Sequence, residues 1–438
     1  MQLSFNFDIR KSSKRVEPIR LVWYGVLFFL GMWLIAPVAP VDTLTVDSVG
    51  YIVVCIVSCM LGTIMLKPKK KYIFISYDYQ KVSRIYRLLI KLSFFAVVLR
   101  LFDIFVARGQ GVGLDSFGEN MDSLQQHESS LSSIIAALFY YVPFLPVFMN
   151  MIFPSVASKK SKILAFVLFC FIGIGAIITG SRNAFLDPLL LLAFLYLFTR
   201  NKIHIKLKNI VVITLLCSIF LMISSVLFIQ RLTVQNKTVF ESTESSTGGY
   251  SDKVPPKDYY INLMGDNENN PAVLGLLFAY AQTTQYAIHG LWEFPIEKEN
   301  IDKHEYRTYG ASTFWVIDKF LYKFGIGIDP EIPHKYNARP GIWSTFFQNW
   351  YMDFGWWGVL WMFVLGLFVK LIWNKIRYEQ NIFYLPLLLF FMLVFMYLMQ
   401  LNRFVGTGTY ALVSFWVFAL WATKSVRIGQ KGKLSLEN

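Results

Sequence analysis

The stretch Ile382–Gln400 reads IFYLPLLLFFMLVFMYLMQ, nineteen consecutive residues without a charge. A helix of about twenty apolar residues crosses the hydrocarbon core of a bilayer, and its backbone hydrogen bonds are all made within the segment. The apolar residues are continuous and do not alternate with polar ones, which favours a helix over a strand of a membrane barrel. The stretch therefore predicts a membrane-spanning helix.

Similar blocks recur along the 438 residues, which are 55% hydrophobic and only 16% charged. A soluble domain of ordinary composition is less apolar and could not bury this much hydrophobic surface. We therefore predict an all-α polytopic membrane protein with about ten transmembrane helices. The other predicted spans are Leu21–Pro40, Val46–Leu66, Leu88–Val106, Leu131–Phe153, Ile163–Thr179, Ala184–Phe198, Ile210–Ile229, Gly355–Trp373 and Thr407–Ala422.

The basic residues predict the orientation of these spans. If the amino terminus is inside, the inner segments carry 26 lysines and arginines, and the four short outer loops carry three. Short cytoplasmic loops are enriched in these residues, so both termini are expected in the cytoplasm. The net charge of +14 is spread over short clusters between apolar blocks. This distribution argues against a nucleic-acid partner and indicates a lipid bilayer.

Three regions follow from this topology. Residues 1–230 form an N-terminal membrane region of about seven spans, and residues 355–438 form a C-terminal membrane region of about three spans with a cytoplasmic tail. Residues 231–354 between them form one large external loop. Within the loop, Pro271–Trp292 and Ser312–Phe324 are predicted to be short amphipathic helices, and Gly248–Asn270 is predicted to be irregular.

Three arginines lie alone in the short outer loops, where positive charge is disfavoured: Arg108, Arg182 and Arg403. Each is either an interfacial residue that reaches lipid phosphate or a residue with a local function. A guanidinium at the head-group level binds phosphate or diphosphate bidentately. Besides a phosphate, Asp187 is a candidate partner for Arg182. Asp187 is followed by Pro188, and this Asp-Pro pair marks either a helix start or a kink.

Three motifs resemble those of bacterial oligosaccharide repeat-unit polymerases of the Wzy type, which build O-antigen and capsule chains. One is the Gly-Ser-Arg turn in Thr179–Leu186, after the fifth apolar span. Another is Arg231, the lone arginine that closes the span before the large loop. The third is the aromatic stretch Thr345–Gly358, with its Phe-Gly-x-x-Gly break.

The resemblance implies glycosyl transfer without a metal or cofactor at the outer face of the bacterial cytoplasmic (inner) membrane. A glycan on polyprenyl diphosphate is moved onto an incoming lipid-linked repeat unit. A flippase and a chain-length regulator are the protein partners that the resemblance implies. The leaving diphosphate needs cationic stabilisation, and the acceptor hydroxyl needs a base.

The segment Asp329–Gly341 is the densest polar cluster of the outer loop and supplies candidates for these roles. His334 is the first candidate base because of its natural pKa, and Glu331 is the second. His304 is an alternative in the same loop. Arg339 precedes an expected aromatic helix, Trp343–Met352, and is predicted at its first turn to stabilise charge. The predicted substrate-binding residues are Arg182, Arg231, Arg403 and Tyr336.

The chain contains no Asp-x-Asp motif and no Walker loop. A metal-dependent nucleotide-sugar transferase and an ATPase are therefore disfavoured. Two alternatives stay open: an O-antigen ligase, which differs in its acceptor, and a glycolipid flippase or transporter. A transporter is expected to carry ionisable groups near the middle of the membrane, whereas the outer cations here gather at the surface.

Overall fold

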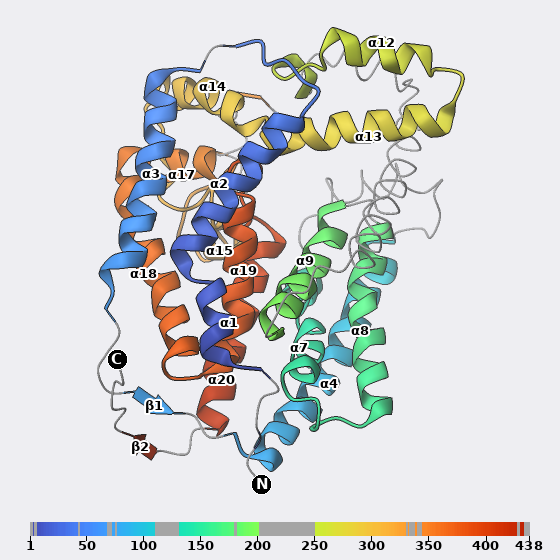
Figure 1. The fold of residues 1–438 in the computed structure, drawn as a ribbon, viewed down its shortest axis with the longest axis vertical. Coiled ribbons are helices and arrows are strands. Elements are labelled where there is room, and N and C mark those ends of the chain that lie inside the picture. Colours follow the sequence, from blue (N-terminus) through green and yellow to red (C-terminus); the bar gives the residue numbers. More distant parts are fainter. Residues whose placement is uncertain are drawn as a thin grey trace.

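The computed structural model describes residues 3, 7–42, 44–67, 72–74, 77–109, 131–178, 182–200, 250–329, 332, 338–339, 344–426 and 430–432. Long helices stand side by side, and α12, α13 and α14 lie across one end of them (Figure 1). The first described helix, α1, and the last strand, β2, lie toward the opposite end. We call the end with α12–α14 the outer end.

The upright helices of the described residues carry the apolar blocks. They are α1 (Ile9–Arg15), α2 (Pro18–Ile35), α3 (Val46–Met65), α4 (Tyr79–Phe102) continued by the π-helical turn η1 (Asp103–Ala107), α6 (Leu131–Leu138), α7 (Phe144–Ile152), α8 (Lys159–Ile178), α9 (Arg182–Thr199), α18 (Gly358–Arg377), α19 (Leu385–Met396) and α20 (Thr407–Val426). Short 3₁₀ turns precede α12 (Tyr250–Asp252), α18 (Gly355–Trp357) and α19 (Ile382–Tyr384).

The outer end is built from shorter helices: α12 (Asp258–Asp266), α13 (Pro271–Ile288), α14 (Gly290–Lys303), α15 (Trp315–Tyr322) and α17 (Phe346–Phe354). Polar residues define their starts. Asn270 caps α13 through the N–H of Val273, and Pro271 occupies the first turn, where its missing N–H costs nothing. A capping box between Thr345 and Gln348 starts α17.

Small residues let the upright helices approach closely. A Cβ on Gly366 of α18 would lie 2.1 Å from the carbonyl oxygen of Cys59 in α3, and one on Gly62 of α3 would lie 2.2 Å from that of Phe363. Such small-residue contacts are typical of helix pairs in membranes. Facing away from the bundle, α2 and α3 expose large apolar side chains, among them Leu34 and Val46. This pattern fits contact with lipid.

The predicted all-α membrane architecture is confirmed in its main features. Among the described residues, three helical segments are long and apolar enough to cross a membrane: Ile9–Ile35, Val46–Met65 and Phe346–Arg377. Leu186–Thr199 and Ile382–Met396 are shorter apolar helices. The predicted span Ile210–Ile229 lies outside the described residues. The number of ten spans, and the boundaries of the three regions, stay predictions.

Several local predictions were wrong. The expected single span Leu131–Phe153 is divided into α6 and α7 by a turn at residues 139–143. The expected irregular segment contains α12, because Lys257 and Asp258 begin a helix there. The chain also forms one short antiparallel pair, β1 (Tyr72–Phe74) with β2 (Gln430–Gly432). Neither strand is long enough to be distinguished from a loop by its sequence pattern.

Candidate active site at the outer end

Asp353, at the end of α17, organises the loop that follows α14. Its side chain is fully buried and accepts the N–H groups of Ser312 and Thr313, each at 2.8 Å, and the hydroxyl of Thr308. A carboxylate with three donors of this kind is well satisfied, even though it is removed from water. Asp353 therefore fixes the turn at residues 308–313 against α17.

A chain of buried hydrogen bonds connects this turn to the loop between α19 and α20. The side-chain amide of Asn349 donates to the Ser312 hydroxyl at 2.5 Å, and that of Asn402 donates to the Asn349 carbonyl oxygen at 3.2 Å. All three residues are buried. Because each member fixes the next, the residue after Asn402 is held in place from three separate elements.

That residue is Arg403, which is buried and forms an ion pair with the buried Asp187 of α9, Nη2 to Oδ1 at 2.8 Å. Its guanidinium lies 4.0 Å from the centre of the Tyr397 ring, a cation–π contact. The Nε of Arg403 is buried and has no hydrogen-bond acceptor among the described residues. An unused donor of a buried cation is suited to an anionic ligand.

Arg182 is the first residue of α9, five positions before Asp187. At a rise of about 1.5 Å per residue, its backbone lies roughly 8 Å along the helix from Asp187. The α9 helix thus brings Arg182 and Arg403 to the same end of the molecule. Asp187 pairs with Arg403, and its predicted pairing with Arg182, whose side chain lies outside the described residues, stays a prediction. Pro188 lies inside α9, so Asp187 does not begin the helix.

A second cluster lies on α14. Glu293 and Glu297, one turn apart, are both buried. Glu293 pairs with Arg339 at 3.1 Å, and Glu297 accepts the N–H of Ala338 at 3.0 Å. Arg339 also binds Asp252 at 2.7 Å. One oxygen of each glutamate is buried without a hydrogen-bond donor among the described residues. We call Glu293, Glu297, Arg339 and Asp252 the α14 acid cluster.

Burial sets the acidity of this cluster. It raises the pKa of Glu293 to about 7, although Arg339 and then Lys253 oppose the shift. Burial also raises the pKa of Glu297 to about 7, against the hydrogen bond from Ala338. A carboxyl group that titrates near neutrality can take up and release protons under physiological conditions. The cluster therefore combines an arginine with two groups suited to proton transfer.

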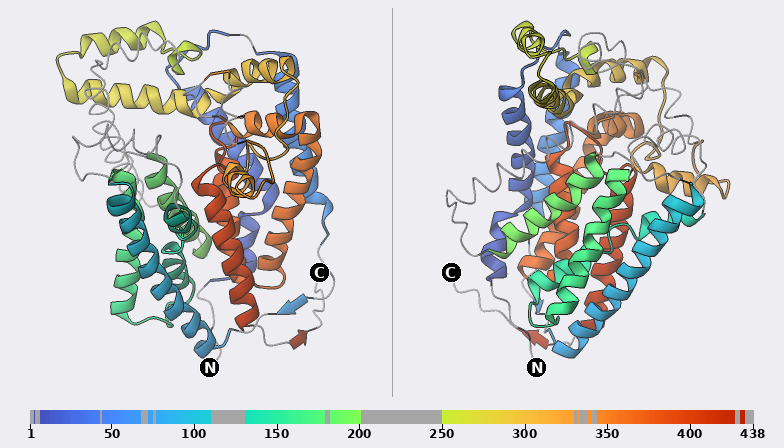
Figure 2. Two further views of the ribbon diagram at one scale, coloured as in Figure 1. Left: turned by 180° about the vertical axis from the view of Figure 1, so that it is seen from behind. Right: turned by 90° about the vertical axis from the view of Figure 1, so that its right-hand side faces the viewer.

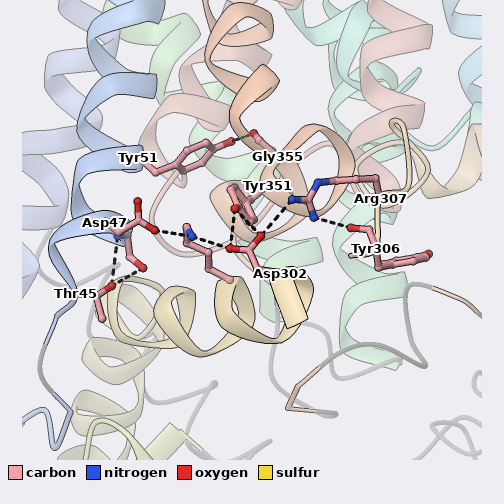
Figure 3. Close-up of polar contacts among 10 residues, drawn as sticks. Thr45, Asp47, Tyr51, Asp302, Tyr306, Arg307, Tyr351 and Gly355 are labelled. Atoms are coloured by element: carbon pink, nitrogen blue, oxygen red, sulfur yellow. Dashed lines mark hydrogen bonds and ion pairs between the residues drawn. The ribbon is translucent and has the colours of Figure 1, made fainter. Parts of the chain in front are cut away.

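A third cluster links α14 to α3 and α17 (Figure 3). Asp302 accepts the Tyr351 hydroxyl at 2.7 Å and binds Lys298 at 2.8 Å and Arg307 at 3.2 Å. Lys298 also binds Asp47 of α3 at 2.5 Å. Burial opposes ionisation of Asp302, but its hydrogen bonds from Lys298, Tyr351 and Arg307 lower its pKa. This cluster anchors the outer loop on α3 beside an open groove of about 780 Å³, which Lys298 and Asp302 help to line.

The predicted site residues are placed as follows. Arg403 is buried at the outer end, as described. Arg339 belongs to the α14 acid cluster; its expected place in the first turn of the aromatic helix was wrong, because α17 begins only at Phe346. The side chain of Arg182 and the residues Arg231, Glu331, His334 and Tyr336 lie outside the described residues. His304, the alternative base, is the exposed C-cap of α14, with Nδ1 2.9 Å from the carbonyl oxygen of Asn300.

The sequence interpretation missed His289 and the two α14 glutamates. His289 is fully buried at the corner between α13 and α14 and packs beside Tyr286, with ring centres 5.6 Å apart. The adjoining Gly290 would place a Cβ 2.2 Å from the carbonyl oxygen of Met399. This corner thus lies against the loop that carries Arg403. The glutamates had a sequence signal, an i, i+4 acidic pair whose three intervening residues, 294–296, are apolar.

A comparison with protein families matches residues 26–426 to the O-antigen polysaccharide polymerase Wzy. The chain belongs to the Wzy family. No curated protein and no solved structure gives a match. The Wzy family assignment confirms the resemblance seen in the sequence motifs and favours neither the ligase nor the flippase. The protein is an O-antigen repeat-unit polymerase, a glycosyltransferase-type membrane enzyme that acts on lipid-linked oligosaccharide repeat units.

No group of His, Cys, Asp or Glu side chains within the described part of this Wzy chain has the arrangement of a metal site. The charged side chains that converge at its outer end include arginines and lysines paired with carboxylates. The chemistry that this end of the polymerase supports is therefore stabilisation of an anion and transfer of a proton.

Proposed function

We propose that this Wzy polymerase transfers the growing glycan from its polyprenyl diphosphate onto an incoming lipid-linked repeat unit, without a metal ion, at the outer face of the bacterial cytoplasmic membrane. Both termini lie in the cytoplasm in this proposal, and a flippase and a chain-length regulator supply substrate and limit the product. The observation that carries the proposal is the buried Arg403, which is held by Asp187 and Tyr397 and whose Nε has no hydrogen-bond acceptor within the described part of the chain.

The proposed reaction exchanges one bond for another. The bond between the anomeric carbon of the growing glycan and the diphosphate oxygen breaks, and the anomeric carbon forms a bond to an acceptor hydroxyl oxygen. The bonding electrons leave with the diphosphate, which remains on its lipid. The acceptor proton passes to a base. The enzyme therefore needs cations at the diphosphate and a proton acceptor at the hydroxyl.

In this proposal Arg182, Arg231 and Arg403 bind the diphosphate, and Arg339 stabilises the charge that develops on it. His334 is the proposed base, with Glu331 second, and Tyr336 lies against a sugar. The α14 acid cluster supports this assignment, because Glu297 and Glu293 bind Ala338 and Arg339, just after the segment that contains these candidates. The cluster also offers Glu293 as a proton acceptor beside Arg339.

The direct test is reconstitution of the purified protein in chelator-treated buffer with an authentic lipid-diphosphate-linked repeat unit. We expect a ladder of glycans on a gel, and we expect Arg403→Gln to abolish it. A ladder that appears only after a divalent cation is added would refute the metal independence. No ladder under any condition with the native substrate would refute the proposed transfer.

A further inference from the structure

A groove of about 280 Å³ lies at the outer end between α6, α15 and α20. Its walls are mainly apolar and include Ile134 of α6, Val316 of α15 and Val413 of α20. Figure 2 shows α15 against the outer part of α20. The groove is separate from the site described above, since none of its lining residues belongs to the Arg403 pair or to the α14 acid cluster.

Two lysines line this groove. Lys319 lies on α15 and Lys323, one turn further, is the C-cap of that helix; Lys319 lies 4.9 Å from the ring centre of Trp315. An apolar groove with cations beside it is complementary to an amphiphile with an anionic head.

The surface around the groove fits access from the membrane. The α15 helix and the loop after it expose large apolar side chains, including Phe320, Phe324 and Ile326. A short helix that exposes both large apolar side chains and lysines is typical of a helix that lies in the membrane interface. A lipid can therefore enter the groove sideways from the outer leaflet, without passing through water.

We propose that this groove binds a second polyprenyl diphosphate, with the diphosphate at Lys319 and Lys323 and the first isoprene units between Val316 and Val413. This inference rests on the proposed function, in which donor and acceptor are both lipid-linked and the enzyme must hold two lipid diphosphates at once. The volume is close to the lower end of pockets for drug-sized ligands, roughly 300 Å³, so the rest of the chain stays in the bilayer.

The test counts bound lipids by native mass spectrometry, with undecaprenyl diphosphate added to protein in phosphatidylcholine nanodiscs. We expect two bound molecules for the wild type. Lys319→Ala/Lys323→Ala and Val413→Trp, which act on the head and on the chain separately, are expected to bind one. The matched controls are Lys257→Ala, an exposed lysine elsewhere at the outer end, and Ile326→Trp on the exposed loop after α15. Both controls should bind two.

Polymerisation is measured on the same samples. The lysine double variant should need at least tenfold more substrate for half-maximal rate and should recover near-normal rates at saturation. Two lipids bound by both groove variants would overturn the inference. Displacement of undecaprenyl diphosphate from the groove by equimolar phosphatidylglycerol would overturn it too and assign the groove to ordinary anionic lipid. Failure of the proposed function would give a different result: the wild type would make no glycan ladder, whatever number of lipids it binds.

Discussion

A double-mutant cycle on the buried pair Arg403–Asp187 tests whether Arg403 acts in catalysis or only in stability. The two charges are removed one at a time and then together. Asp187→Asn leaves the Arg403 cation buried without its counter-ion, and Arg403→Gln leaves the Asp187 carboxylate buried alone. The side chains of the pair are only 8% and 5% exposed, so solvent cannot replace the lost partner. Removing one member of a buried pair costs about 3–5 kcal/mol. The double variant buries no charge and should recover most of that loss.

Catalytic rate should behave differently. If Arg403 stabilises the leaving diphosphate, Arg403→Gln should lower the polymerisation rate by about 10²-fold or more, the usual cost of losing a preorganised charge-stabilising donor. The double variant should stay at that low rate, although its stability returns. Asp187→Asn keeps the guanidinium and should lose less activity than Arg403→Gln, once both are compared at equal amounts of folded protein.

The assay pairs denaturant-dependent unfolding in detergent with the glycan-ladder assay at saturating substrate. The surface pair Lys375–Glu379, at 3.7 Å, is the matched control, and its cycle should change stability by less than about 1 kcal/mol. Recovery of polymerisation together with stability in the double variant would refute the reasoning, because Arg403 would then act only in folding.

Three further predictions concern other parts of the outer end and the bundle. Burial raises the pKa of Glu293 and Glu297 from 4.5 to about 7, so the folded state binds more protons than the unfolded state between these pH values. Wild-type stability should therefore fall as the pH rises from 5 to 8, measured as the melting temperature across pH. The double variant Glu293→Gln/Glu297→Gln should flatten that slope. Asp353→Asn replaces one acceptor oxygen by an amide donor that faces a backbone N–H, and should cost about 1–3 kcal/mol and increase protease cleavage within residues 305–314, relative to wild type. Gly366→Leu should prevent formation of the α3–α18 contact and abolish a monodisperse gel-filtration peak, whereas Gly31→Leu, which meets nothing within 4 Å, should not.

The helices were predictable from sequence, and their interruptions were only partly so. The block Ile382–Gln400 predicted α19 because an uncharged apolar run has few alternatives in a membrane. The turn between α6 and α7 was missed because residues 139–143 carry no charge and residues 140–143 are buried within the bundle, although Pro143 is a signal for a helix break. A hydropathy pattern measures burial in apolar surroundings, and it responds weakly to a turn whose polar backbone groups are hydrogen-bonded inside the protein.

The site was predictable at the level of residue type and much less at the level of partners. Arg403 was identified because a lone cation in a short outer loop opposes the topological preference. Its partner Asp187 lies in α9, in a different part of the chain, and Arg339 meets Asp252 across 87 positions of sequence. Such pairs depend on how the helices pack, and no local spacing encodes them. The buried acidic pair on α14 escaped notice because acidic residues in a long external loop are usually solvated.

The arginines at the outer end share one property that bears on turnover. Arg403 and Arg339 each have a buried carboxylate partner, Asp187 and Glu293 respectively. A buried arginine without a counter-ion would be costly, so the carboxylates stabilise the site between substrates. A diphosphate that binds there must compete with them, which lowers its affinity below that of an unpaired arginine cluster. Weakened binding suits the proposed reaction, in which one polyprenyl diphosphate is released in every cycle before the next repeat unit is joined.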